Sequence, residues 1–343
     1  MDRKIAIRKQ RWLDFLDLTS PQRLVFLIRY APELPTRPLP DPQRKHERVE
    51  WIWQNYNYHL DRMRWLDDDT LPCLDMLGGT EIFAEAFGCP IYRSPNNMPF
   101  AMPFVHSANE AARLKIPTLD APPLALAFEM ADDLYRRAGP GALFRLVDLQ
   151  SPMDVAALIW EKTDFFTALV DHPDVVLALV EKIRRLQFAF LDEWFRRYGH
   201  EFVAHFPDYY LPEGVSLSVD EIGSVSAKMF VQYFLPDLIQ FSQHYGALGV
   251  HCCAHARHQW AHFKQVPNLR LLNLCQPGDT LQSAYPFFKE VSAQWHFDQS
   301  LHPKNPSTWL QELPSDIHFC IELIAESRDD ALRLSDRYRG FGV

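Results

Sequence analysis

The sequence predicts an α/β fold, a (β/α)8 TIM barrel with an N-terminal helical extension. One reason is that short apolar runs alternate with long amphipathic stretches, as in the repeated strand–helix units of a parallel sheet. The second reason is that side chains able to bind a metal or move protons follow successive apolar runs. A barrel carries its functional groups at those strand ends. The 343 residues are enough for one large domain of this kind.

The chain divides into a helical first part and an alternating second part. Residues 1–65 are expected to form the helical extension, with the proline-rich residues 32–40 as an extended crossing, because proline interrupts helices. Residues 66–343 are expected to form the barrel. Its predicted strands are residues 143–149, 214–219, 247–251, 269–275, 291–297 and 317–325. Its predicted helices are residues 173–199, 226–246, 281–290 and 328–339.

The composition narrows the class of protein. Hydrophobic residues make up 47% of the chain and charged residues 23%, as in ordinary globular proteins. The net charge is −9 without a basic block, which disfavours nucleic acid as a partner. No apolar run reaches about 18 residues, so no membrane-spanning helix is expected. The N-terminus lacks the apolar core of a signal peptide, and six cysteines without secretory features indicate reduced thiols in a cytoplasmic protein.

A candidate metal site lies at the end of the run at residues 247–251. His251 and Cys253 are two residues apart, so both side chains point to one face of an extended segment. An imidazole and a thiolate are zinc ligands, and a mixed nitrogen and sulfur set selects zinc over hard cations. Cys275 ends the next apolar run and can converge on the same place. Cys320 and Glu322, which share one face of the last run, are alternative further ligands.

Other polar residues at predicted strand ends are candidates for catalysis and substrate binding. Asp220 is expected to act as a general acid or substrate-binding carboxylate, and Glu221 as a substrate-binding group. The alternative is that this acidic pair caps the next helix. His296 is a candidate ligand or base, or a histidine hydrogen-bonded inside the core. Gln150 and Asp298 are candidates for binding a small-molecule substrate.

The order of these features resembles the uroporphyrinogen decarboxylase superfamily, which includes zinc-dependent methyltransferases acting on methylated corrinoid proteins. Each segment is short, but their order and spacing together cover most of residues 70–335. The segments that carry the resemblance are residues 80–88 (TEIFAEAFG), 148–154 (DLQSPMD), 165–169 with 172–173 (FFTAL, HP), 218–223 (SVDEIG), 226–230 with 235–236 (SAKMF, LP) and 251–253 (HCC).

Departures from the superfamily pattern favour its methyltransferase branch. True decarboxylases have two arginines after the first strand that bind substrate carboxylates, whereas this chain has only Arg29 there. The methyltransferase branch implies zinc ligation by His251, Cys253 and Cys320, although the usual glycine-cysteine-glycine turn is absent around Cys320. Cobalamin-independent methionine synthase has a glutamate ligand where this chain has Cys275.

The resemblance implies a zinc-dependent methyltransferase that moves a methyl group between a corrinoid on a partner protein and a thiol or similar small acceptor. Two alternatives stay open at this point. One is a decarboxylase or lyase without metal, with Asp220 as the acid. The other is a non-catalytic barrel that binds a corrinoid or another small molecule. The superfamily's tendency to dimerise also makes a homodimer an expectation.

Overall fold

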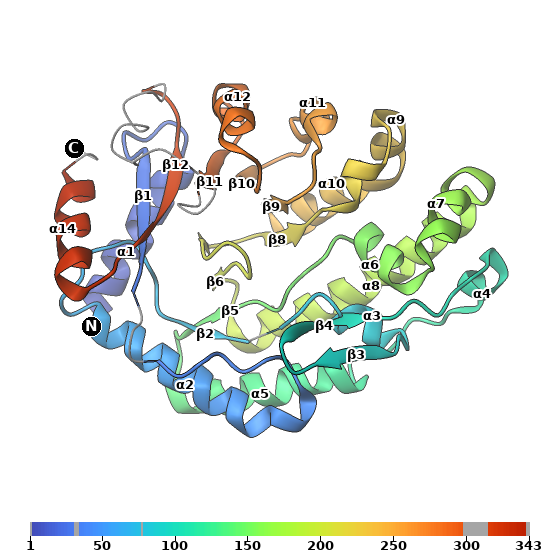
Figure 1. The fold of residues 1–343 in the computed structure, drawn as a ribbon, viewed down its shortest axis with the longest axis horizontal. Coiled ribbons are helices and arrows are strands. Elements are labelled where there is room, and N and C mark those ends of the chain that lie inside the picture. Colours follow the sequence, from blue (N-terminus) through green and yellow to red (C-terminus); the bar gives the residue numbers. More distant parts are fainter. Residues whose placement is uncertain (1, 31–33, 77, 298–314, 341–343) are drawn as a thin grey trace.

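The computed structural model describes residues 2–30, 34–76, 78–297 and 315–340 (Figure 1). Its main sheet has six strands, all parallel, which pair in the order β1-β12-β11-β10-β9-β8. The five predicted strands from residue 214 onward all belong to this sheet. Its strands are β1 (Leu24–Arg29), β8 (Val215–Ser218), β9 (Leu248–Cys252), β10 (Leu269–Leu274), β11 (Ala293–Phe297) and β12 (Phe319–Ile324).

A second sheet continues the first one. Its order is β2-β5-β6-β7, with β2 and β5 parallel to one another and β6 and β7 forming an antiparallel pair. An isolated parallel bridge between Gln150 and Ser218 connects the segment after β5 to β8. The strands of this sheet are β2 (Cys73–Asp75), β5 (Leu143–Arg145), β6 (Phe202–Val203) and β7 (Tyr210–Leu211), and a separate hairpin is formed by β3 (Ile91–Ser94) and β4 (Asn97–Ala101).

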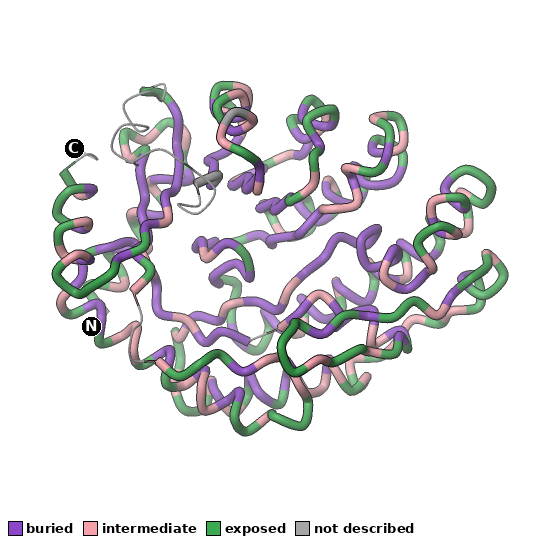
Figure 2. The backbone as a smooth tube through the Cα atoms, in the orientation of Figure 1, coloured by how far each residue is buried: buried purple, intermediate pink, exposed green. Residues whose placement is uncertain are grey.

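Helices lie around the outside of the strands (Figure 1). The strands are mostly buried, whereas the outward faces of the helices are exposed (Figure 2). The longer helices are α1 (Asp2–Leu16), α2 (Lys45–Arg62), α5 (Pro122–Ala138), α7 (Lys162–Asp171), α8 (Pro173–Tyr198), α10 (Leu235–Tyr245), α12 (Gly278–Phe288) and α14 (Arg328–Arg339). The shorter ones are α3 (Ile82–Ala86), α4 (Ala108–Arg113), α6 (Pro152–Ile159), α9 (Ala227–Met229) and α11 (Trp260–Phe263), with the 3-10 turns η1 (Pro42–Arg44), η2 (Glu221–Ser224) and η4 (Arg257–Gln259) and the π-helical turn η3 (Phe230–Phe234). Within the described ranges, no helix is both long and apolar enough to cross a membrane.

The architecture is a mixed α/β fold with a parallel sheet, and the sheet is not closed. Among the described residues, no strand pairing joins β1 to β2. On the edge of β1 that pairs with no other strand, two backbone N–H groups instead donate to buried carboxylates. Asp69 Oδ2 accepts a hydrogen bond from the Phe26 N–H at 3.0 Å, and Asp68 Oδ2 accepts one from the Ile28 N–H at 3.1 Å. Because these groups already have partners, β1 does not need a second neighbouring strand.

The first 65 residues differ from the predicted helical extension. Residues 24–29 form β1, which pairs in register with β12 from Leu24 opposite Phe319 to Arg29 opposite Ile324. This strand was hard to recognise because it is a single continuous apolar run, which fits a buried strand and a buried helix equally well. Helices α1 and α2 do occur on either side of it. The N-terminal part therefore contributes to the main sheet itself.

Strand β9, which carries the candidate metal ligands, passes very close to a tyrosine. A Cβ atom on Gly249 would lie 1.8 Å from the hydroxyl oxygen of Tyr209. This hydroxyl group donates a hydrogen bond to Ser216 on the neighbouring strand β8, at 2.9 Å. Only glycine leaves room for this contact, which explains the glycine just before the His251 segment.

Candidate metal centre

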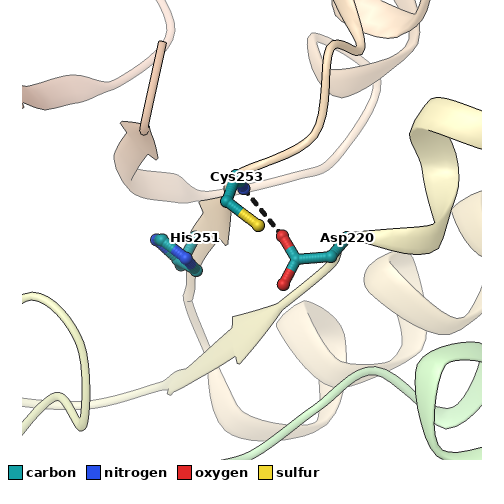
Figure 3. Close-up of side chains that lie close together, drawn as sticks. All are labelled: Asp220, His251 and Cys253. Atoms are coloured by element: carbon teal, nitrogen blue, oxygen red, sulfur yellow. Dashed lines mark hydrogen bonds between the residues drawn. The ribbon is translucent and has the colours of Figure 1, made fainter. Parts of the chain in front are cut away.

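The ends of β8 and β9 bring together Asp220, His251 and Cys253 (Figure 3). One potential ligand atom from each residue lies within 4.8 Å of those of the other two. His251 is in β9, Cys253 directly follows it, and Asp220 lies two residues beyond the end of β8. These neighbouring parallel strands pair in register up to Ser218 and His251, so their carboxyl ends meet at one edge of the sheet. The cluster therefore offers one oxygen, one nitrogen and one sulfur donor.

The loop that carries Asp220 is held by hydrogen bonds on both sides. The Cys253 N–H donates to Asp220 Oδ1 at 2.7 Å. Behind the loop, Asp154 Oδ1 accepts hydrogen bonds from the N–H groups of Asp220 at 2.9 Å and Glu221 at 2.8 Å. Asp154 is 4% exposed, and its other oxygen accepts a hydrogen bond from the Ser151 hydroxyl. The buried carboxylate of Asp154 thus positions the backbone from which Asp220 projects.

The ring of His251 is oriented by Asn273 on the next strand, β10. His251 Nδ1 lies 2.5 Å from Asn273 Oδ1, while Asn273 Nδ2 donates to the Trp295 carbonyl oxygen. Because the amide nitrogen is used by that carbonyl, the amide oxygen faces the imidazole and accepts its Nδ1–H. This arrangement leaves the lone pair on Nε2. Burial lowers the pKa of His251, which favours the neutral form that binds metals.

The thiol of Cys253 is protonated at neutral pH in this environment. Desolvation of the sulfur, the hydrogen bond with Asp220 and the negative charge of Asp220 together raise the pKa of Cys253 to about 12. A thiolate beside a carboxylate is unfavourable unless a cation lies between them. A bound divalent metal would instead favour the thiolate form of Cys253, because a coordinating thiol loses its proton.

A pocket of about 270 Å³ opens beside the cluster. Asp148 lies in its wall, where its Oδ1 accepts a hydrogen bond from Gln150 Nε2 at 2.7 Å and lies 3.0 Å from His205 Nε2. Burial alone would raise the pKa of Asp148, but the contacts with His205 and Gln150 lower it overall. The pocket is lined by Arg37, Asp75, Gly78, Thr80, Met98, Arg145, Leu146, Asp148, Gln150, His205, Phe206, Ser218, Asp220 and His251.

Three of the predicted metal ligands are not brought into the cluster. Cys275 follows β10 and its Sγ is 3.7 Å from Asn273 Oδ1. Cys320 is fully buried in β12, and Glu322 on the same strand forms an ion pair with Arg29 at 2.8 Å. Strand β12 is three positions from β9 in the sheet order, which corresponds to about 14 Å at roughly 4.8 Å per strand. The cluster found among the described residues contains none of the three.

The other predicted site residues have different positions. Gln150 is 7% exposed and lines the pocket, and its role in substrate binding stays a prediction. Glu221 forms an ion pair with Lys162 and is not among the residues that line the pocket. His296 belongs to β11, but its side chain lies outside the described part of the structure, as does all of Asp298.

Several residues that build the site were not predicted from the sequence. Asp154 fits the pattern of a helix start, since the Ser151 side chain caps α6, and this pattern concealed its second contact with the Asp220 loop. Asn273 could have been recognised from the sequence, because a polar amide inside an otherwise apolar strand must form a hydrogen bond with a buried partner. His205 lies in a short irregular segment between β6 and β7, where no pattern marks it.

A variant of Asp154 tests how strongly it positions the Asp220 loop. Asp154→Ala leaves two backbone N–H groups without their acceptor, so we expect zinc affinity to fall about 10–100-fold, the range for groups that orient metal ligands. Asp154→Asn keeps one acceptor oxygen and should recover part of the loss. Asp174→Ala, an exposed aspartate in the first turn of α8, is the matched control. Zinc titration of each folded variant measures the effect, and equal affinities for Asp154→Ala and Asp174→Ala would contradict the assignment.

No protein-family model matches the chain, and neither does any curated protein sequence. Among solved structures, the fold is similar to that of a methyltransferase from Methanosarcina mazei, with a TM-score of 0.62. The two chains are 14% identical, and the match covers 88% of each. At this level of identity the similarity shows the fold alone. The chain is thus an α/β protein with the fold of that methyltransferase and with a nitrogen, oxygen and sulfur cluster at the carboxyl ends of its strands.

Proposed function

We propose that this protein is a zinc-dependent methyltransferase that moves a methyl group between a corrinoid on a partner protein and a thiol or similar small acceptor. The observation that carries the proposal is the convergence of Asp220, His251 and Cys253 beside a pocket. The similarity to the Methanosarcina mazei methyltransferase supports it at the level of the fold. We also propose that the strands follow the order of a (β/α)8 barrel whose wall is open between β1 and β2.

The donor set of the cluster fits zinc. Zinc binds thiolate, imidazole and carboxylate ligands at about 2.0–2.3 Å, which places tetrahedral ligands about 3.3–3.8 Å apart. The ligand atoms here lie within 4.8 Å, so side-chain shifts of about 1 Å bring them into range. Three protein ligands are typical of catalytic zinc, which keeps a fourth position for substrate. In this proposal Asp220 is the third ligand, in place of Cys275, Cys320 or Glu322.

Each residue of the site then has a defined task. Zinc supplies the chemistry of holding the acceptor thiol as a thiolate at neutral pH. Asn273 keeps the imidazole of His251 in the tautomer with a free Nε2. His205 contacts Asp148 and Ser218 through Nε2, so its Nδ1 would be the atom that takes up the proton released by the acceptor thiol. Gln150 orients the acceptor from the pocket wall.

The size of the pocket supports delivery of the methyl group by a partner. At about 270 Å³, it is slightly below the roughly 300–1,000 Å³ of pockets that enclose drug-sized ligands. A small thiol fits this volume, whereas a corrinoid is far larger. The corrinoid would therefore be presented at the opening by the protein that carries it. The cytoplasmic location and the homodimer stay predictions from the sequence.

Removal of the metal tests the proposed function. Protein purified without added metal is expected to contain about one zinc per chain, since three protein ligands make one catalytic site. It should transfer the methyl group of methylcobalamin to at least one of a panel of small thiols. Treatment with a chelator should abolish transfer, and added zinc should restore it. Zinc-free wild-type protein, or activity that survives chelation, would contradict the proposal, and the latter would favour a metal-free lyase.

A further inference from the structure

A second and larger pocket, of about 540 Å³, lies between α2 and the carboxyl ends of β1 and β12. It shares no lining residue with the pocket beside the metal cluster. The boundary between the two pockets is an ion pair, because Asp208 lines the larger pocket while its partner Arg145 lines the smaller one. The larger pocket is therefore a separate feature that the proposed methyl transfer does not use.

One face of α2 forms a wall of this second pocket. Trp51, Asn55 and His59 are spaced four residues apart, so they lie above one another on the helix, and all three line the pocket. Trp51 Nε1 donates to the Pro35 carbonyl oxygen at 2.8 Å, which holds the indole ring in place. The wall therefore presents an aromatic ring, an amide and an imidazole in a row.

The two polar groups of this wall have no hydrogen-bond partner in the described part of the chain. Asn55 is 9% exposed, and no described residue hydrogen-bonds to its amide. The buried Nδ1 atom of His59 is likewise without a partner within those ranges. Buried polar side chains are nearly always hydrogen-bonded, because an unpaired one costs about 1–3 kcal/mol. His59 Nδ1 is such an exception, and beside it the largely buried Asn55 side chain lines the same pocket, so together they indicate a place where a ligand supplies hydrogen bonds.

The charges of the pocket disfavour a ligand that carries a phosphate or a carboxylate, since the carboxylate of Glu326 also lines it. Arg29 is already paired with Asp208 and Glu322, each at 2.8 Å. Arg62 is paired with Asp68 at 2.6 Å. Burial lowers the pKa of His59 to about 3, so its imidazole is neutral at physiological pH. No cation of the described lining is left over to balance a phosphate or carboxylate on a ligand.

We propose that this pocket binds an uncharged planar heteroaromatic ring with a hydrogen-bond donor beside an acceptor on one edge, the chemistry shared by nucleobases and pterins. The ring would pack on Trp51. Its edge would pair with the amide of Asn55, which offers a donor and an acceptor side by side, as asparagine does when it reads adenine. His59 would take one further hydrogen bond, and the pocket volume suits a ligand the size of a nucleoside.

Calorimetric titration of the full-length protein with adenosine and, separately, with 6-methylpterin tests this proposal and distinguishes the two sources. At least one probe is expected to bind with Kd below about 1 mM. Asn55→Ala should weaken that binding about tenfold, the cost of one or two hydrogen bonds. Asn57→Ala is the matched control, because Asn57 is exposed on the same helix and donates to its own helix backbone at Trp53.

Several results would overturn the proposal. These are no binding of either probe, equal loss with Asn55→Ala and Asn57→Ala, or adenosine monophosphate binding ten or more times more tightly than adenosine. Should Asn55→Ala fail to fold, Trp51→Leu carries the test, with the same tenfold loss expected from the missing ring contact. The measurement involves neither methyl transfer nor zinc content, so its outcome is independent of the proposed function.

Discussion

Protein with both His251→Ala and Cys253→Ala is expected to lose zinc binding by more than about 100-fold and to lose methyl transfer with it. Changes to groups that merely orient ligands cost about 10–100-fold in metal affinity, and loss of two of three ligands costs more. His251 lies at the end of β9 and Cys253 directly follows it, and neither side chain belongs to the hydrophobic core. Metal analysis after dialysis, together with zinc titration, measures the effect.

Single variants identify the third ligand of the same site. Asp220→Ala is expected to lose zinc, whereas Cys275→Ala is expected to retain it, because Cys275 lies outside the cluster of ligand atoms. His255→Ala is a control for histidine removal, since His255 is exposed in the loop after β9. Zinc loss from Cys275→Ala with retention by Asp220→Ala would show that the cysteine is the ligand and that Asp220 has another role.

Asp68→Ala is expected to lower the free energy of unfolding by about 3–5 kcal/mol, the cost of removing one partner from a buried ion pair. Asp68 is fully buried and contacts Arg62 at 2.6 Å and Arg8 at 3.2 Å. It also accepts the N–H of Ile28 on the unpaired edge of β1. Its loss leaves two buried guanidinium groups and a strand N–H without their carboxylate. Urea unfolding at equilibrium measures the change.

The matched control for this stability prediction is Asp61→Ala. Asp61 forms an ion pair with Arg64 at 3.0 Å, but both side chains are more than 60% exposed. Exposed pairs contribute about 0–1 kcal/mol, so this variant should unfold almost like the wild type. Equal destabilisation by the two alanine variants would show that the buried carboxylate does not hold the edge of β1.

Features of the fold that depend on local geometry could be predicted from the sequence. The strand that carries His251 was predicted from its apolar run, and the alternation of side chains along it places His251 and Cys253 on one face. Asp220 was recognised because it follows the preceding strand. These inferences depend on short stretches of chain, whose conformations follow from the periodicity of their own side chains.

Features that depend on which strands are neighbours in the sheet could not be predicted from the sequence. The sequence does not reveal that three strand positions separate β12 from β9, which keeps Cys320 and Glu322 out of the cluster. Nor does it reveal that Asp68 and Asp69 satisfy the edge of β1, so that the sheet stays open beside β2. The contact between Asp154 and the Asp220 loop joins residues 66 positions apart.

By itself, the sequence determined the alternation of strands and helices, the polar residues at the strand ends and the shared face of His251 and Cys253, because each follows from side-chain periodicity within one segment. Only the tertiary structure decided that Asp220 is the third member of the cluster, that Asn273 sets the tautomer of His251 and that α2 forms the wall of a second pocket. These features depend on contacts between segments distant in the chain, and such contacts exist only after the strands have taken their order in the sheet.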